Sequence, residues 1–201
     1  MALMFMAGGL GYWMGRPDRP GPGSADVGFL QDMIVHHEQA VAMSYAAIEG
    51  VTDREVRGFA KDILTAQQYE IGLMDGWLRR WDQPREDPDP LSMEWAGHKH
   101  PQGRMPGMAT SEELEAQAEA TGTQAEEEFL HLMIRHHQGG VQMAEAALER
   151  ASDDEVLGLA ELIVAAQRSE IGEMSATLER LGLPPATDIP GYESAPDDSE
   201  G

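Results

Sequence analysis

Apolar side chains recur at intervals of three and four residues along four long stretches of this chain. In the first stretch they include Phe29, Met33, Ala40 and Ala47, and His37 falls on the same face. This spacing is typical of amphipathic helices with one buried face. The pattern therefore predicts four long helices, at about 26–50, 52–81, 123–150 and 152–181.

Polar residues indicate where these helices begin. Asp26 is expected to cap the first, and the capping-box pattern Ser/Thr-x-x-Glu occurs at 52–55, 110–113, 123–126 and 152–155. The pattern at 110–113 predicts an additional short helix, to about Ala120. Very short connections join the first long helix to the second and the third to the fourth, so each pair is expected to form an antiparallel hairpin.

The two hairpins are copies of one unit. Aligned without a gap, Phe29–Trp81 and Phe129–Leu181 are identical at 25 of 53 positions. Within them, FLQDMIVHHEQAVAM at 29–43 corresponds to FLHLMIRHHQGGVQM at 129–143, so both copies keep an adjacent pair of histidines. Self-similarity at a fixed spacing indicates a repeated structural unit.

A long, proline-rich connection, 82–123, separates the repeats 26–81 and 126–181. A long connection between the second and third helices is the ferritin-like arrangement of a four-helix bundle. We therefore expect an all-α fold without strands, with one bundle spanning 26–182. The acidic segment 183–201 contains Pro and Ser and is expected to be disordered.

Residues 1–25 precede the predicted bundle. Met1–Gly15 is apolar and uncharged but shorter than the ~20 residues that a membrane span needs. Arg16–Ala25 is a Pro- and Gly-rich linker. We interpret this region as the end of a signal sequence or anchor rather than a merely apolar N-terminus. The expected location is extracytoplasmic, either secreted or anchored to a membrane at the N-terminus.

Composition narrows the function. A net charge of −22 argues against nucleic acid as a partner, because phosphates need Lys and Arg. The absence of cysteine excludes thiolate metal sites, disulfides and Cys nucleophiles. The sequence also has no P-loop, no Gly-x-Ser-x-Gly and no dinucleotide-binding glycine motif, so an enzyme is not the favoured interpretation.

The inward faces of the predicted helices carry possible metal donors in both repeats. These donors are His36, His37, His136, His137, Met33, Met43, Met133, Met143, Glu70 and Glu170. Imidazole and thioether groups suit copper, and thioethers suit Cu(I) in particular. The histidines are the expected main ligands, the methionines supporting donors, and the carboxylates partners or orienting groups.

Two alternatives remain open. A di-iron site in a bundle needs four carboxylates and two histidines. Here only Glu70 and Glu170 form a symmetric carboxylate pair, because the positions equivalent to Asp32 and Glu38 are not acidic in the second repeat. Iron is therefore less expected than copper, although an oxidoreductase of di-iron or copper type is an alternative function. The other alternative is a metal-free polar layer of His, Glu and Gln that serves only structure or interaction.

The long connection carries a second group of soft donors, namely His98, His100, Met105 and Met108. On flexible, accessible backbone they would form a secondary site for transient metal capture, or they would simply belong to an exposed loop. The Gly139–Gly140 pair beside His137 is expected to allow close packing or room next to the histidines.

Three motifs together resemble the bacterial family called domain of unknown function 305. They are the twofold Phe-Leu…Met-Ile-x-His-His…Met, the later Gln67-x-x-Glu70-Ile-x-x-Met74, and Met105-Pro-Gly-Met108-Ala. The resemblance covers about 26–182 and implies a ferritin-like bundle, usually exported or membrane-anchored, with some relatives implicated in copper binding and resistance. The short N-terminus of this chain departs from that pattern.

The residues and the resemblance together lead to one leading hypothesis. We expect an extracytoplasmic metal-binding protein that buffers, sequesters or delivers copper, with the metal ion and a possible copper-transfer protein as partners. The oligomeric state is left open by the sequence.

Overall fold

The computed structural model describes residues 19–87, 91–97, 99–101 and 104–192. The apolar segment Met1–Gly15 and His98, both singled out in the sequence, lie outside the described residues. No helix among the described residues is long and apolar enough to cross a membrane.

The described part of the chain is almost entirely helical, which confirms the all-α prediction. Its α-helices are α2 (Ala25–Gly50), α3 (Arg54–Arg80), α4 (Ser111–Glu119), α5 (Thr123–Arg150) and α6 (Asp154–Leu181). The connection between α3 and α4 also contains a 3-10 helix, η1 (Glu94–Ala96), and two short antiparallel strands, β1 (Leu91–Ser92) and β2 (His100–Pro101). The expectation of no strands was wrong for this two-stranded pairing.

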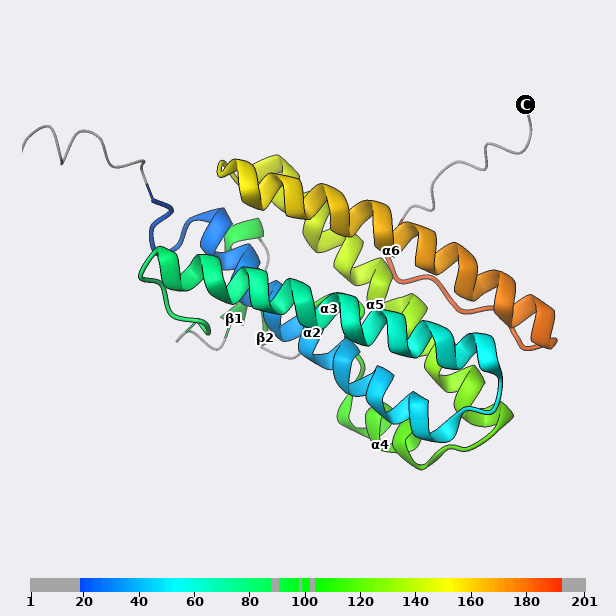
Figure 1. Ribbon diagram of the computed structural model, residues 1–201. Helices are drawn as coiled ribbons and strands as arrows, with labels where there is room; N and C mark the ends of the chain where they lie inside the picture. Colours follow the sequence, from blue (N-terminus) through cyan, green and yellow to red (C-terminus); the bar gives the residue numbers. More distant parts are fainter. Residues whose placement is uncertain (1–18, 88–90, 98, 102–103, 193–201) are drawn as a thin grey trace, which may run out of the picture.

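The long helices form two antiparallel hairpins that pack through their first helices. α2 lies along α3, α5 lies along α6, and α2 and α5 pack against each other, while α3 and α6 touch over a shorter stretch (Figure 1). The connection between the hairpins packs on α2 and α5 through η1 and α4. The central pair, α2 and α5, is therefore covered by the outer helices and by the connection.

Two separate apolar clusters fill this arrangement, one toward each end of the helices. The first contains Leu30, Met74, Met143 and Ile163, and the second contains Met43, Ile63, Leu130 and Met174. Each cluster draws on all four long helices, so neither hairpin buries its apolar face alone. Between the two clusters, the middle of every long helix carries polar rather than apolar side chains.

Of the five predicted helix caps, Asp26 and four capping boxes, the structure confirms one. The box at Thr110 is confirmed, with Glu113 reaching back to the Thr110 amide. The other helices are instead capped by Ser24, Asp53 and Asp153, while α5 begins after Gly122, so Asp26 does not cap α2.

Glu126 and Asp26, which do not cap their own helices, have another role that was not predicted from the sequence. Glu126 is buried at the start of α5 and accepts hydrogen bonds from the Thr52 amide, the Thr52 hydroxyl and the Asp53 amide of the first hairpin loop. Asp26, its equivalent in the first repeat, accepts from Ser152 and Asp153 in the same way. Each repeat therefore fastens the hairpin loop of the other.

The segment after α6 is ordered farther than expected. Residues 183–192 run along α5, where the Pro184 carbonyl accepts from His131 and the Pro190 carbonyl accepts from Gln142. Gln138 bonds the Asp188 carboxylate and the Ile189 amide. The segment 183–201 was predicted to be disordered, but its first part, 183–192, packs on α5.

The cross-repeat bonds can be tested with Glu126→Ala. The change leaves two backbone amides of the first hairpin loop without an acceptor, and we expect a loss of about 3 kcal/mol in the free energy of unfolding, measured by urea denaturation. Glu127→Ala, at the partly exposed neighbouring position, is the control and should change stability by less than about 0.5 kcal/mol. Equal effects of the two changes would contradict this role of Glu126.

Candidate functional site

The four paired histidines lie between the two apolar clusters, at the middle of the central helices. His36 and His37 come from α2, His136 and His137 come from α5, and all four side chains are 0% exposed. Burying an imidazole in this way requires partners for its ring nitrogens, because an unpaired polar group is costly away from water.

Each pair sends one histidine to the neighbouring outer helix. The Nε2 atom of His37 lies 2.7 Å from Oε2 of Glu70 on α3, and Nε2 of His137 lies 2.7 Å from Oε2 of Glu170 on α6. Both carboxylates are partly exposed, at 20% and 27% of their side chains. A carboxylate that accepts from one ring nitrogen fixes the orientation of the ring and raises its basicity.

The other histidine of each pair meets its equivalent across the α2–α5 contact. The rings of His36 and His136 are 3.8 Å apart between centroids and tilted by 33°. Nε2 of His136 lies 3.0 Å from the backbone carbonyl oxygen of His36, whereas Nε2 of His36 lies 3.1 Å from the carbonyl oxygen of Pro106 in the connection. The two repeats therefore differ here, since His36 takes its acceptor from a loop.

The second ring nitrogen, Nδ1, is the distinctive feature of all four histidines. Every Nε2 faces an oxygen that can only accept, so in the neutral ring the proton is on Nε2 and Nδ1 carries a lone pair. All four Nδ1 atoms are buried and have no hydrogen-bond partner among the described residues. In their neutral form the four rings thus present four Nδ1 lone pairs, and no donor among the described residues pairs with them.

Electrostatics keeps the facing rings neutral. Burial lowers the pKa of His36 from 6.5 to about 3, and the nearby His37 and His137 lower it further, while the bond to Pro106 acts in the opposite direction. Burial likewise holds the pKa of His136 well below its ordinary value, with further lowering by the other three histidines. At neutral pH these rings are lone-pair donors rather than cations.

The methionines named in the sequence analysis are all buried, but they do not group by repeat. Met33 and Met143 belong to one apolar cluster, and Met43 and Met133 belong to the other. Each side of the histidine layer therefore has one thioether from each repeat. Met33 and Met43, although they belong to the same repeat, therefore lie in different apolar clusters.

Gln67 and Gln167, three residues before Glu70 and Glu170, are also buried polar side chains. Gln67 and Gln167 are each 3% exposed, and their Oε1 atoms have no partner among the described residues. A side chain at Gly140 would place Cβ 2.2 Å from Oε1 of Gln167, and one at Gly139 would place it 1.9 Å from the Pro106 carbonyl oxygen. The glycine pair gives room to a glutamine and to a loop, which agrees with the expected close packing beside the histidines.

The second group of donors is not the accessible cluster that the sequence suggested. Met105 is only 2% exposed and packs in the same apolar cluster as Met33, while Met108 is partly buried against it. His100 lies half-buried in β2, and its pairing partner there is Ser92. The prediction of exposed, flexible backbone was wrong for Met105, because Pro106 anchors this loop on His36.

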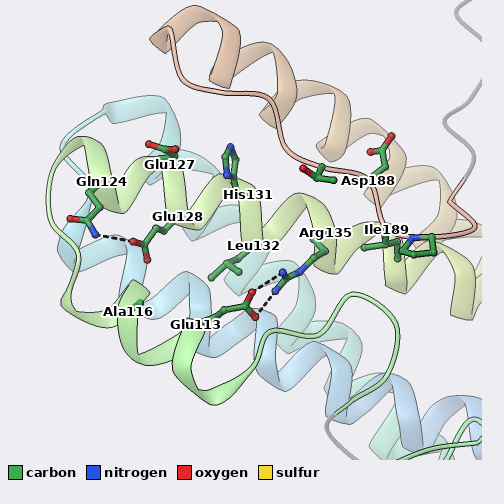
Figure 2. A pocket seen from close by; sticks show the side chains of 12 residues that line it. Glu113, Ala116, Gln124, Glu127, Glu128, His131, Leu132, Arg135, Asp188 and Ile189 are labelled. Carbon is green, nitrogen blue, oxygen red and sulfur yellow. Dashed lines mark hydrogen bonds and ion pairs between the residues drawn. The ribbon is translucent and has the colours of Figure 1, made fainter.

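Other polar groupings in the described residues are weaker candidates. A cavity of about 680 Å³ lies between α4, α5 and the C-terminal segment, but Arg135 and Glu113 in its wall already pair at 2.6 Å, and Gln124 donates to Glu128 (Figure 2). Nowhere in the described ranges do three His, Asp or Glu side chains gather closely enough to hold a metal ion on their own. A metal site in the histidine layer would therefore need thioether donors as well.

The neutral state of the facing rings predicts a pH dependence of stability. The unfolded chain binds protons on His36 and His136 below about pH 6.5, and the native protein does not until much lower pH, so stability falls as the pH drops through this window. His36→Gln/His136→Gln keeps an N–H donor near the position of Nε2 and removes the titration. Urea midpoints between pH 4 and 8 should fall less steeply in this variant, and parallel curves would contradict the prediction.

Solved structures of two bacterial proteins are similar to this one over most of its length. A candidate secreted protein of the family DUF305 from Streptomyces coelicolor is 41% identical, with 83% of this chain and 99% of that chain covered and a TM-score of 0.78. A DUF305 fragment from Deinococcus radiodurans is 39% identical, with coverages of 80% and 97% and a TM-score of 0.67.

CopM, solved in its Cu(II)-bound form, is also similar. It is 27% identical to this chain, with 78% of this chain and 97% of that chain covered and a TM-score of 0.64. CopM has also been solved in a Cu(I)-bound form, at 26% identity, and in a silver-bound form. A comparison with curated protein sequences gives no match.

The sequence profile of the domain of unknown function DUF305 matches residues 26–178, which include all four helices of the two hairpins and the histidine layer. This match extends over far more than half of the chain. The protein therefore belongs to the DUF305 family.

Proposed function

We propose that this protein is an extracytoplasmic copper-binding protein that buffers, sequesters or delivers Cu(I), and that its helices form a ferritin-like four-helix bundle around the metal site. In this proposal the main ligands are the four paired histidines, the supporting donors are methionines, and the carboxylates orient the rings. The residues are His36, His37, His136, His137, Met33, Met43, Met133, Met143, Glu70 and Glu170.

The observation that carries the proposal is the excess of buried lone pairs at the middle of the molecule. Four Nδ1 atoms and the Oε1 atoms of Gln67 and Gln167 are all acceptors without a donor among the described residues. Buried polar groups are normally paired, so these unpaired acceptors would be satisfied by a species that accepts lone pairs or donates protons. A metal cation is the simplest such species.

The surrounding donors favour a soft cation. The thioethers of Met33 and Met143 lie on one side of the layer and those of Met43 and Met133 on the other, and thioethers select Cu(I) over harder ions. Among the described residues, the carboxylates that bond the paired histidines are those of Glu70 and Glu170, and each is already directed at one histidine. A di-iron oxidoreductase, which needs four carboxylates, is supported less.

A metal-free structural layer is the main competing function. It would require buried water molecules that donate hydrogen bonds to the Nδ1 atoms, since the described side chains offer none. It would leave the thioethers on both sides of the layer as ordinary apolar filling. The competing proposal predicts that the histidines affect stability but that copper has no effect.

Similar proteins lend support on two points. CopM, at 26–27% identity, has been solved with Cu(I) and with Cu(II), and a family member at 41% identity is described as a candidate secreted protein. We extend both properties to this chain and include a copper-transfer protein as a possible partner. The loop donors His98, His100, Met105 and Met108 are kept as a secondary capture site in this proposal.

The proposal is tested by an anaerobic Cu(I) titration of the purified protein against a chromogenic Cu(I) chelator. We expect the wild-type protein to compete for Cu(I) in a stoichiometric manner. His37→Gln/His137→Gln keeps an N–H donor toward Glu70 and Glu170 but removes both Nδ1 lone pairs, and it should lose at least tenfold in affinity, or about 1.4 kcal/mol. A wild-type protein that takes no Cu(I) from the chelator would exclude the proposal.

The supporting thioethers can be tested separately. Met33→Leu/Met133→Leu conserves volume and apolar character, so stability should fall by less than about 1.5 kcal/mol for each change. Removal of one sulfur on each side of the layer should nevertheless weaken Cu(I) binding in the same titration. Ile34→Leu/Ile134→Leu, at the adjacent buried positions, is the matched control and should bind Cu(I) as the wild type does. Equal affinities in the methionine and isoleucine variants would remove Met33 and Met133 from the site.

A further inference from the structure

Among the described residues of the connection, the loop Met105–Met108 reaches the histidine layer through a hydrogen bond. Its Pro106 carbonyl oxygen accepts from Nε2 of His36 at 3.1 Å. Directly after it, the Ala109 amide and carbonyl pair with the side chain of Gln39 on α2, at 2.6 and 3.0 Å. The loop is therefore fixed to α2 within one turn of His36.

The same loop lies directly against α5. Gly107 has φ +76, and a Cβ there would come within 2.3 Å of the Arg135 carbonyl oxygen. Gly139 has no side chain at the point where the Pro106 carbonyl oxygen lies. Two glycines, one on each partner, thus allow the backbone of the loop to contact the backbone of the helix beside His136.

A cavity borders this loop on the side of solvent. It has a volume of about 610 Å³, and both Met105 and Met108 line it, together with Gln39. Met108 is partly buried, whereas Met105 is 2% exposed and shares an apolar cluster with Met33 and Met143. Met108 is therefore the more accessible of the two, and Met105 belongs both to the cavity wall and to the apolar cluster that contains Met33 and Met143.

We propose that this cavity is the entrance through which a soft monovalent cation, Cu(I) or Ag(I), reaches the histidine layer, with Met108 and then Met105 as transient ligands. The inference rests on the proposed copper function and adds the route to it. Each step exchanges one thioether ligand for another, without a change in oxidation state or any proton transfer. Arg104 and Glu112 at the cavity carry opposite charges, so this pair does not favour cations by net charge. The ion is therefore selected by the two sulfur atoms.

A route residue has a kinetic signature that distinguishes it from a ligand of the final site. If Met105 and Met108 bind the ion only in passage, their loss raises the barrier for entry and for exit by the same amount, and the equilibrium affinity is unchanged. If they belong to the final site, their loss weakens the affinity. Rates and affinity measured on the same variant therefore separate the two roles.

The experiment is stopped-flow transfer of Cu(I) from the chromogenic chelator to the full chain, followed by release to excess chelator. For Met105→Leu/Met108→Leu we expect both rates to fall by about tenfold or more while the equilibrium constant is retained. Met93→Leu is the matched control, because Met93 is 3% exposed in the same connection and apolar cluster but does not line the cavity. Its rates should equal those of the wild type.

Gly139→Ala tests the same route, and here we expect the rates to increase rather than to fall. The added methyl group would displace the Pro106 carbonyl and loosen the loop, so uptake and release should both be faster, and amide hydrogen exchange at 104–109 should increase.

Unchanged rates in the methionine double variant would overturn the inference, and so would a loss of affinity, in which release becomes faster relative to uptake. If the wild-type protein binds Cu(I) tightly but the double variant gives either of these results, the proposed function stands and only the route is overturned. A wild-type protein that binds no Cu(I) would instead overturn the proposed function itself.

Discussion

The burial of four imidazole rings at the centre of the molecule is the constraint on which the rest of the structure depends. Each ring needs an acceptor for Nε2 where water is excluded, and the four acceptors come from four different places: Glu70 on α3, Glu170 on α6, the His36 carbonyl on α2, and the Pro106 carbonyl in the connection. The outer helices and the loop are thus positioned by the same layer that divides the apolar core into two clusters.

The twofold repeat cannot be kept perfectly at this layer. His37 and His137 have equivalent carboxylate partners, but His36 and His136 meet face to face, and only His136 bonds the backbone of the other helix. A loop carbonyl completes the second partnership, and the glycine at 139, where the first repeat has Gln39, makes space for it. The two repeats therefore differ at the place where the loop that carries Pro106 reaches the histidine layer.

Helical periodicity and the internal repeat were sufficient to predict the all-α fold, the four long helices and the inward direction of both histidine pairs, because these depend on local spacing and on a pattern present twice. The links from His37 to Glu70 and from His137 to Glu170 were anticipated only as partnerships between a buried carboxylate and a histidine. The roles of Asp26, Glu126 and Pro106 could not be predicted from local spacing, because they depend on contacts between segments far apart in the chain. Asp26 and Glu126 were detectable in principle, since they occupy equivalent positions in the two repeats.

The central claim is that the buried histidines present unprotonated Nδ1 atoms to a soft cation. Long-range ¹⁵N–¹H correlation spectra of histidine-labelled protein at pH 7, with and without Ag(I), measure this directly. The expected result is four rings protonated only at Nε2, whose Nδ1 resonances move on addition of one or more equivalents of Ag(I) while the Nε2 protons remain. Protonated Nδ1 atoms in the metal-free protein, or Nδ1 resonances that do not respond to Ag(I), would contradict the claim and leave the layer with a structural role.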